Sequence, residues 1–154
     1  MKRFKPLFIA LAIPLTVGGL SALAAGGMSD YQQLTQPPLS PPGWLFPIMW
    51  SILYLLMGFA SWRVWKRDIP MEQKRKALGL YAVQLALNFL WSPIFFRFRL
   101  YLPAFILLVV LWIAIFVTIR AFWAADEKAG DLLIPYILWV SFAAYLNFGI
   151  FLLN

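Results

Sequence analysis

The sequence predicts an all-α integral membrane protein, a bundle of five transmembrane helices with a cytoplasmic N-terminus and an external C-terminus. Its composition is the first observation: 63% of the 154 residues are hydrophobic, against about 45–50% in soluble domains. Five apolar segments, the second observation, each approach the about 20 residues that a helix needs to cross the hydrocarbon. Helices are the expected form because backbone polar groups in lipid must be satisfied within each segment.

The five segments form one domain, residues 1–154, without an internal repeat. Their expected bounds are residues 6–26, 44–65, 78–96, 101–123 and 132–153, and the longest connection is the loop of residues 28–43. An odd number of helices does not suit the paired halves of an inverted-repeat transporter.

The distribution of basic residues is the third observation, and it sets the orientation. Only Arg97 and Arg99 lie on one side, which the positive-inside rule puts outside. The other basic residues precede the first helix or flank the second and fourth connections: Lys2, Arg3, Lys5, Arg63, Lys66, Arg67, Lys74, Arg75, Lys76, Arg120 and Lys128. This distribution accounts for the net charge of +7 without a nucleic-acid partner. Helical spans of this kind suit a bacterial cytoplasmic (inner) membrane.

The chain contains no cysteine and no histidine. This excludes thiol nucleophiles, histidine general bases, zinc sites and histidine-ligated haem. The spanning segments hold no acidic residue, so a proton relay of the pump type is not expected. We therefore expect no metal site, no tightly bound cofactor and no conventional catalytic constellation.

The first segment is expected to be a retained helix. Its basic start and Ala22-Leu23-Ala24 resemble a signal peptide, but its apolar run exceeds the about 7–15 residues of such a signal. Every fourth position forms a ridge that permits close helix approach: Ala10, Pro14, Gly18, Ala22 and Gly26. The ridge faces either a helix of the same chain or a second subunit.

Residues 37–50 lead from a proline-rich connector into the second helix. Proline lacks an N–H and restricts the backbone, so the connector should be stiff and non-helical. Pro47 lies in the first helical turn, where the missing N–H has no partner to lose, and Trp50 follows within one turn. We expect the loop of residues 28–43 to act as a lid over a ligand site that contains Trp50.

Polar and aromatic residues mark the second and third helices. One face of the second helix carries Pro47, Trp50, Tyr54 and Ser61. Trp62 and Trp65, at its cytoplasmic end, are expected to be interface anchors. The third helix has Trp91 beside polar residues at every fourth position: Gln84, Asn88 and Ser92. Such polar residues either join helices or line a cavity, and both interpretations stay open.

The last two helices differ in character. The fourth is almost featureless aliphatic sequence, typical of a packing or lipid-facing helix. A solvated loop is expected for the acidic connection of residues 124–131, which includes Asp126. The fifth helix opens with Pro135 and places three residues on one face: Trp139, Ala143 and Leu146. A small residue between two large ones leaves room for a flat ligand or for a neighbouring helix.

Three motifs together resemble the tryptophan-rich sensory protein or translocator protein (TspO) family, formerly called peripheral benzodiazepine receptors. They are Pro41-Pro42-Gly43-Trp44 with Trp50, Asn88-x-x-Trp91-Ser92, and Pro135-Tyr136-x-x-Trp139-x-x-Phe142-Ala143-x-x-Leu146-Asn147. The resemblance extends from about Tyr31 to the C-terminus. It implies a five-helix bundle, commonly a homodimer in membrane lipid, with a pocket beneath the first loop.

The resemblance also implies ligands. Family members bind porphyrins, notably protoporphyrin IX, and aromatic drugs of the benzodiazepine and isoquinoline carboxamide types; animal members bind cholesterol. Some bacterial members degrade protoporphyrin in light with tryptophans that match Trp50 and Trp139, which are the candidate photochemical residues. The family's pocket positions fall on Tyr31, Pro41, Phe46, Trp50, Tyr54, Asn88, Trp91, Ser92, Trp139, Ala143 and Leu146.

The cholesterol motif of the animal members is not intact. Its tyrosine position is Phe148 here, and no arginine or lysine follows in the sequence. The resemblance therefore does not carry sterol binding over to this chain.

A porphyrin suits the remaining residues, because aromatic walls with a few polar groups accommodate an apolar disc with two carboxylates. Without histidine or cysteine, the metal-free ring is the expected guest. Trp50 and Trp139 are expected to face the macrocycle, and Asn88 or Ser92 to fix its orientation. The candidate partners of its carboxylates are Arg97 and Arg99. Three functions stay open: a porphyrin receptor or sensor, a light-dependent porphyrin-degrading protein, and a transporter of porphyrins or other small hydrophobic molecules.

Overall fold

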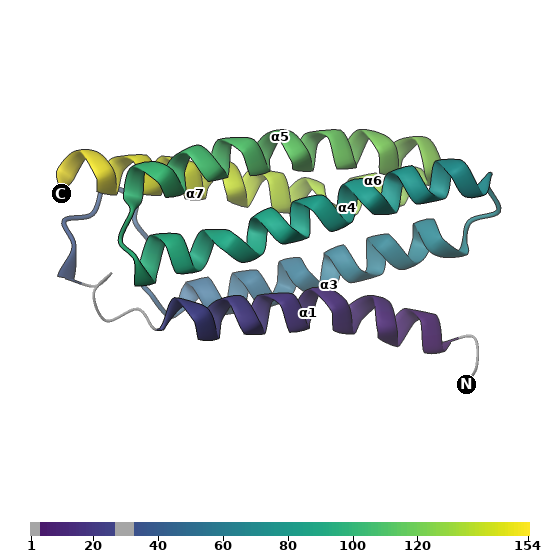
Figure 1. The fold of residues 1–154 in the computed structure, drawn as a ribbon, viewed down its shortest axis with the longest axis horizontal. Helices are drawn as coiled ribbons and strands as arrows, with labels where there is room; N and C mark the ends of the chain where they lie inside the picture. The colour runs from purple at the N-terminus through teal and green to yellow at the C-terminus, as the bar shows by residue number, and fades with distance from the viewer. Residues whose placement is uncertain (1–3, 27–32) are drawn as a thin grey trace.

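The computed structural model describes residues 4–26 and 33–154, and this part of the chain contains helices and no strand. Five helices within the described residues are long and apolar enough to cross a membrane, which confirms the predicted all-α bundle of membrane-spanning helices. They form an elongated bundle in which α1 begins at one end and α7 finishes at the other (Figure 1). The elements are α1 (Lys5–Ala25), α3 (Leu45–Lys66), α4 (Met71–Ser92), the π-helical η2 (Pro93–Arg97), α5 (Tyr101–Ala125), α6 (Glu127–Leu132) and α7 (Ile134–Leu153).

The small-residue ridge of α1 packs within the same chain. A Cβ atom on Gly58 of α3 would lie 2.6 Å from the Ala10 carbonyl oxygen, so the two backbones are in close contact. On α4, the Phe89 carbonyl accepts a hydrogen bond of 2.8 Å from the Ser21 hydroxyl. Close packing of this kind needs small side chains at the contact. The ridge therefore joins α1 to α3, and the neighbouring Ser21 joins α1 to α4, whereas Ala22 and Gly26 at the end of the ridge are exposed.

α4 begins at Met71, earlier than the expected residue 78. Pro70 precedes the helix, and its carbonyl accepts a hydrogen bond of 3.1 Å from the Lys74 N–H. The extra residues are mostly charged, so a boundary drawn from apolar residues alone misses them. At the other end, the helix continues past Pro93 as the π-helical η2 and ends at Arg97.

The connection after α5 is not a solvated loop throughout, which corrects the expectation for Asp126. Its side chain is only 5% exposed, and its Oδ2 accepts a hydrogen bond of 2.6 Å from Arg63 Nε. The short α6 packs against α3 and brings the carboxylate to this arginine. Burial raises the pKa of Asp126, but the Arg63 hydrogen bond and the charges of Arg63 and Arg67 outweigh burial and hold that pKa below its usual value.

Residues 33–43 of the first loop dock on the C-terminal half of α7. The Thr35 N–H donates to Asn154 Oδ1 at 3.1 Å, and Asn154 Nδ2 donates to the Thr35 carbonyl at 2.8 Å. The Tyr145 hydroxyl donates to the Pro38 carbonyl at 2.6 Å. These bonds hold the described part of the loop against the end of the bundle at which α7 finishes.

Candidate functional site

A cavity of about 430 Å³ lies between α1, α3 and the junction of α4 with η2. Its volume falls within the range of small-molecule sites, about 300–1,000 Å³. Small residues of α1 form one wall, and aromatic residues of α3, α4 and η2 form the other. The lining residues are Leu15, Gly18, Gly19, Ser21, Ala22, Ala25, Phe46, Pro47, Trp50, Ser51, Tyr54, Trp91, Ser92 and Phe96.

Trp50 is at the centre of the aromatic wall. Its ring stacks on Tyr54 with 5.6 Å between the centroids, and it lies 6.5 Å from the Trp91 ring. Tyr136 of α7 meets it edge-on at 6.3 Å. The indole is therefore held from three sides, while part of it remains exposed to the cavity. Such a surface can stack on a flat apolar ligand.

A buried hydrogen-bonded chain supports this wall. The Tyr54 hydroxyl donates to Asn88 Oδ1 at 2.7 Å, and Asn88 Nδ2 donates to the Tyr136 hydroxyl at 2.7 Å. Tyr136 in turn donates to Gln84 Oε1 at 2.6 Å. The chain joins α3, α4 and α7, because polar groups in lipid must find partners within the protein. Of the three polar residues on the third helix, Gln84 and Asn88 therefore join helices, and Ser92 lines the cavity.

Trp91 is fixed by a second set of contacts. Its indole Nε1 donates to Asn147 Oδ1 at 3.1 Å, and Asn147 Nδ2 donates to the Tyr101 carbonyl at 2.8 Å. The Phe95 ring stacks on it with 5.2 Å between the centroids. Asn147 of α7 thus links Trp91 of α4 to the start of α5, and these contacts hold the indole at the edge of the cavity.

The predicted positions on α7 do not line this cavity. Trp139 meets Phe46 edge-on at 5.8 Å, and its indole nitrogen has no hydrogen-bond partner among the described residues. Ala143 and Leu146 line a separate void of about 10 Å³, whose wall also includes Phe46 and Trp91. Phe46 and Trp91 border both spaces, and so lie between these α7 positions and the larger cavity.

The other predicted positions lie at the rim or away from the cavity. Arg97 Nη1 donates to the Ala24 carbonyl at 3.4 Å, which puts the guanidinium at the C-terminal end of α1, beside the cavity. Arg99 is exposed and has a left-handed backbone, φ +55°. Pro41 is in the loop and does not line the cavity. Tyr31 lies outside the described residues.

The wall from α1 is the part of the site that the sequence did not reveal. A Cβ atom on Gly18 would overlap the Tyr54 ring, so this glycine allows α1 to approach the aromatic wall. The regular spacing of small residues on α1 was the available signal, but it could not say which helix they face. None of the described residues that line the cavity is charged. No group of histidine, cysteine, aspartate or glutamate side chains is placed to hold a metal ion in residues 4–26 and 33–154.

Comparison with known proteins finds one family and several relatives that are similar to this chain over most of its length. Residues 10–153 match the TspO/MBR family. The tryptophan-rich protein TspO of Chlorobaculum tepidum is 42% identical over 155 residues, which cover 99% of this chain and 98% of that protein. Protein CrtK of Rhodobacter capsulatus is 39% identical over 153 residues, which cover 98% of this chain and 92% of that protein. The translocator protein of Ovis aries is 37% identical over 131 residues, which cover 84% of this chain and 78% of that protein.

Proposed function

Since this chain belongs to the TspO/MBR family, we propose that it is a membrane receptor for protoporphyrin IX or a related flat tetrapyrrole. The observation that carries the proposal is the cavity of about 430 Å³ with Trp50, Tyr54 and Trp91 in its wall. A porphyrin offers a wide apolar face, and such faces bind best to aromatic side chains that are already held in place. Trp50 is the main stacking surface in this proposal.

The rim of the cavity supplies a partner for the carboxylates. Arg97 lies beside the end of α1, where its guanidinium can form paired hydrogen bonds with a propionate group. Ser92 and Ser51 offer hydroxyl groups inside the cavity. The porphyrin ring would then lie against Trp50 with its propionates toward Arg97.

The middle of the bundle favours a receptor over a transporter. The contact of Gly58 with Ala10 closes the space between α1 and α3. The chain of hydrogen bonds from Tyr54 through Asn88 to Tyr136 joins the helices at about the same level. A substrate that crossed between α1 and α3 would have to break the first contact, and one that crossed between α3, α4 and α7 would have to break the second.

The proposal is tested by titrating the purified protein with protoporphyrin IX and following the porphyrin absorbance. Trp50→Ala removes the stacking surface, and we expect an affinity loss of about tenfold, since an aromatic pair contributes about 0.5–1.5 kcal/mol beyond area burial. Trp112→Ala, which changes an exposed tryptophan of α5 outside the cavity, is the matched control and should bind normally. Unchanged affinity in Trp50→Ala would contradict the proposal.

The carboxylate contact is tested separately with Arg97→Gln. The variant should bind protoporphyrin IX several-fold more weakly, because a charge-assisted hydrogen bond is lost. Its affinity for the dimethyl ester of protoporphyrin should equal that of the natural protein, because the ester carries no carboxylate. Equal losses for both ligands would indicate a structural effect instead.

Light-dependent degradation of the porphyrin is a second candidate function, favoured by the position of Trp50 in the cavity wall. An indole can give one electron to a photoexcited porphyrin; dioxygen then adds to the reduced ring and cleaves it, and the electron returns to the indole radical cation, so that both oxygen atoms end in the opened ring and dioxygen is the oxidant consumed. Illumination with and without dioxygen, followed by the loss of porphyrin absorbance, tests this function. We expect Trp50→Phe combined with Trp139→Phe to abolish the loss; an undiminished rate would exclude both tryptophans.

The membrane setting completes the proposal. The chain is a multi-pass membrane protein, and we place it in the bacterial cytoplasmic membrane with its N-terminus in the cytoplasm. The clustering of Lys5, Arg63, Lys66 and Arg67 supports this orientation, because these residues lie at ends of α1 and α3 that share one side of the bundle. The proposal includes a homodimer, which the resemblance to the family implies. Light scattering of the detergent-solubilised protein tests this oligomeric state.

A further inference from the structure

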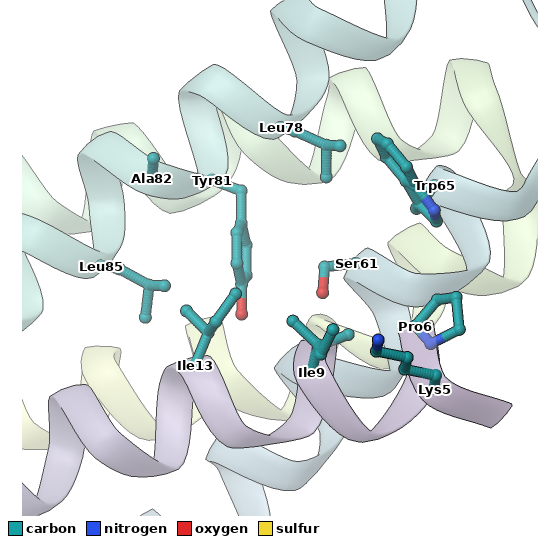
Figure 2. A pocket seen from close by; sticks show the side chains of 11 residues that line it. Lys5, Pro6, Ile9, Ile13, Ser61, Trp65, Leu78, Tyr81, Ala82 and Leu85 are labelled. Carbon is teal, nitrogen blue, oxygen red and sulfur yellow. The ribbon is translucent and has the colours of Figure 1, made fainter. Parts of the chain in front are cut away.

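A second cavity, of about 570 Å³, lies in the opposite half of the bundle between α1, α3 and α4 (Figure 2). It shares no lining residue with the cavity beside Trp50. Its walls are mostly aliphatic, and Figure 2 shows Ile9 and Ile13 of α1 facing Leu78 and Leu85 of α4. An aliphatic lining suits an alkyl chain better than a flat aromatic ring.

Tyr81 places one unpaired polar group inside this cavity. Its side chain is 6% exposed, and its ring is held by stacking on Phe122 at 5.8 Å. The hydroxyl has no hydrogen-bond partner among the described residues, and it points into the space between α4 and α1 (Figure 2). The nearby Ser61 hydroxyl donates its own proton to the Gly58 carbonyl at 2.9 Å, and its oxygen lies close to the Tyr81 hydroxyl without completing a well-formed hydrogen bond. A buried donor without a well-formed partner is costly, so an acceptor on a ligand would stabilise Tyr81.

The end of the cavity is basic. Lys5 is one of its lining residues, and Figure 2 shows the Lys5 amine turned toward the cavity. Trp65 lines the same end, and Lys74 Nζ lies 5.4 Å from the Trp65 ring centroid. The ion pair found among the described residues joins other side chains and leaves both lysines available to an anion. Trp65, expected to be only an interface anchor, thus also borders a cavity.

The cavity is bordered by residues that face the membrane. Ile9 and Ile13 are 50% and 49% exposed, although both lie within a membrane-spanning helix. Their exposed surface is covered by lipid rather than water. A lipid chain can therefore enter from the side, between α1 and α4, without crossing an aqueous phase.

We propose that this cavity binds an anionic glycerophospholipid. One acyl chain lies along Ile13 and Leu85, an ester carbonyl accepts the proton of Tyr81, and the phosphate lies at the mouth beside Lys5 and Lys74. The order of the groups along the lipid matches the order of the side chains along the cavity. Basic pockets between transmembrane helices are suited to lipid head groups. The proposal does not depend on porphyrin binding in the other cavity.

Three probe lipids test the proposal by native mass spectrometry of the delipidated, detergent-solubilised protein. Phosphatidylglycerol carries the anionic head group and the ester carbonyls, and phosphatidylcholine with the same chains has no net charge. Dialkyl phosphatidylglycerol has ether links in place of the esters. We expect phosphatidylglycerol to bind several-fold more tightly than either of the others. Equal binding of phosphatidylglycerol and phosphatidylcholine would overturn the proposal.

Variants assign the contacts to residues. Tyr81→Phe keeps the ring and should lower the affinity for phosphatidylglycerol about fivefold, the effect of one hydrogen bond, without changing the affinity for the ether lipid. Lys5→Gln should reduce the preference for phosphatidylglycerol over phosphatidylcholine. Lys66→Gln is the matched control, because Lys66 lies over Trp62 at 4.1 Å and does not line the cavity.

Folding and the other cavity are monitored in the same samples. Tyr81→Phe and Lys5→Gln should bind protoporphyrin IX as the natural protein does, so a failure of the lipid proposal is distinguishable from a failure of the porphyrin proposal. Ala82→Phe, which fills the cavity, should abolish binding of phosphatidylglycerol while the helical circular dichroism is retained. Full lipid binding by Ala82→Phe or by Tyr81→Phe would place the lipid elsewhere and overturn the proposal.

Discussion

Gly18 lies where α1 closely approaches the aromatic wall of the cavity. A side chain there would overlap the Tyr54 ring. Tyr54 stacks on Trp50 and donates to Asn88, so a displacement of its ring would disturb the cavity and the buried hydrogen bonds together. Helix association in lipid depends on close packing of this kind, because the lipid tails are as apolar as the helices.

Gly18→Ala should therefore lower both stability and porphyrin affinity. Overpacking of a tight contact costs about 1–3 kcal/mol, which appears as a lower apparent Tm in detergent. Gly79→Ala is the matched control, because a Cβ atom at Gly79 would meet no neighbouring atom within 4 Å; it should raise stability by about 0.5–1 kcal/mol through helix propensity. Equal apparent Tm values for the two variants would show that the contact with Tyr54 is not tight.

α4 shows how one helix can serve several functions through its different faces. Gln84 and Asn88 bind Tyr136 and join the helix to its neighbours. After Pro93 the backbone continues as η2, which contributes Phe96 to the cavity wall. π-Helical turns are frequent at functional sites because they change which side chains face a neighbour. In this protein η2 contributes Phe96 to the cavity wall and places Arg97, the next residue, at the rim.

The junction of α3 with α6 contains the ion pair of Arg63 with Asp126, and Asp126→Asn tests its contribution. Loss of the charged hydrogen bond from Arg63 should cost about 2 kcal/mol near pH 7. The pKa of Asp126 is lower in the folded protein than the about 3.9 of an unfolded aspartate. The pair therefore stabilises fully above that value, and its contribution is lost as the pH falls through the folded pKa.

Apparent Tm values measured across acidic and neutral pH check this prediction. The difference between the natural protein and Asp126→Asn should be largest near neutral pH and should shrink in acid. Glu127→Gln, a change in the exposed neighbouring carboxylate, is the control and should follow the natural protein. If the difference in apparent Tm between the two proteins does not vary with pH, the substitution destabilises the protein through altered packing rather than through the lost charge.

At the scale of the whole molecule, two of the cavities in the bundle lie in opposite halves and differ in chemistry. The cavity beside Trp50 is walled by aromatic and small residues, and Arg97 lies at its rim. The other is mostly aliphatic, with Lys5 at its mouth. On α3, Gly58 with its close contact to α1 lies between Tyr54 of one cavity and Ser61 of the other. This arrangement suits two classes of ligand bound independently, as the two proposals require.

The orientation of the bundle can be tested directly because the chain has no cysteine. Leu39→Cys lies in the first loop at a position that is 83% exposed, and Met71→Cys lies at the start of α4 at a position that is 52% exposed. The positive-inside rule predicts that a membrane-impermeant maleimide labels Leu39→Cys in intact cells and Met71→Cys only after permeabilisation. The reverse labelling pattern would show that the N-terminus is outside.

Parts of the candidate site could be predicted from the sequence, and particular residues show the limit. Trp50 could be placed because the proline-rich connector and the helical period fix its position and its face. Trp139 shares a face with Ala143 and Leu146, but the helical period does not reveal that Phe46 of another helix covers that face. Asp126 was expected in solvent because its neighbours are polar, whereas α6 brings it to Arg63.

The sequence by itself determined that this protein has five membrane-spanning helices, and the motifs on them indicated its family. Hydropathy and charge are sums over neighbouring residues, so they can be read directly from the order of the chain. Only the tertiary structure showed that Gly18 and its neighbours form a wall of the cavity beside Trp50. It also showed that the Tyr81 hydroxyl, in the second cavity, has no hydrogen-bond partner among the described residues. Cavities and buried partners form where helices distant in sequence meet, and the side chains at those contacts depend on how all the helices pack together.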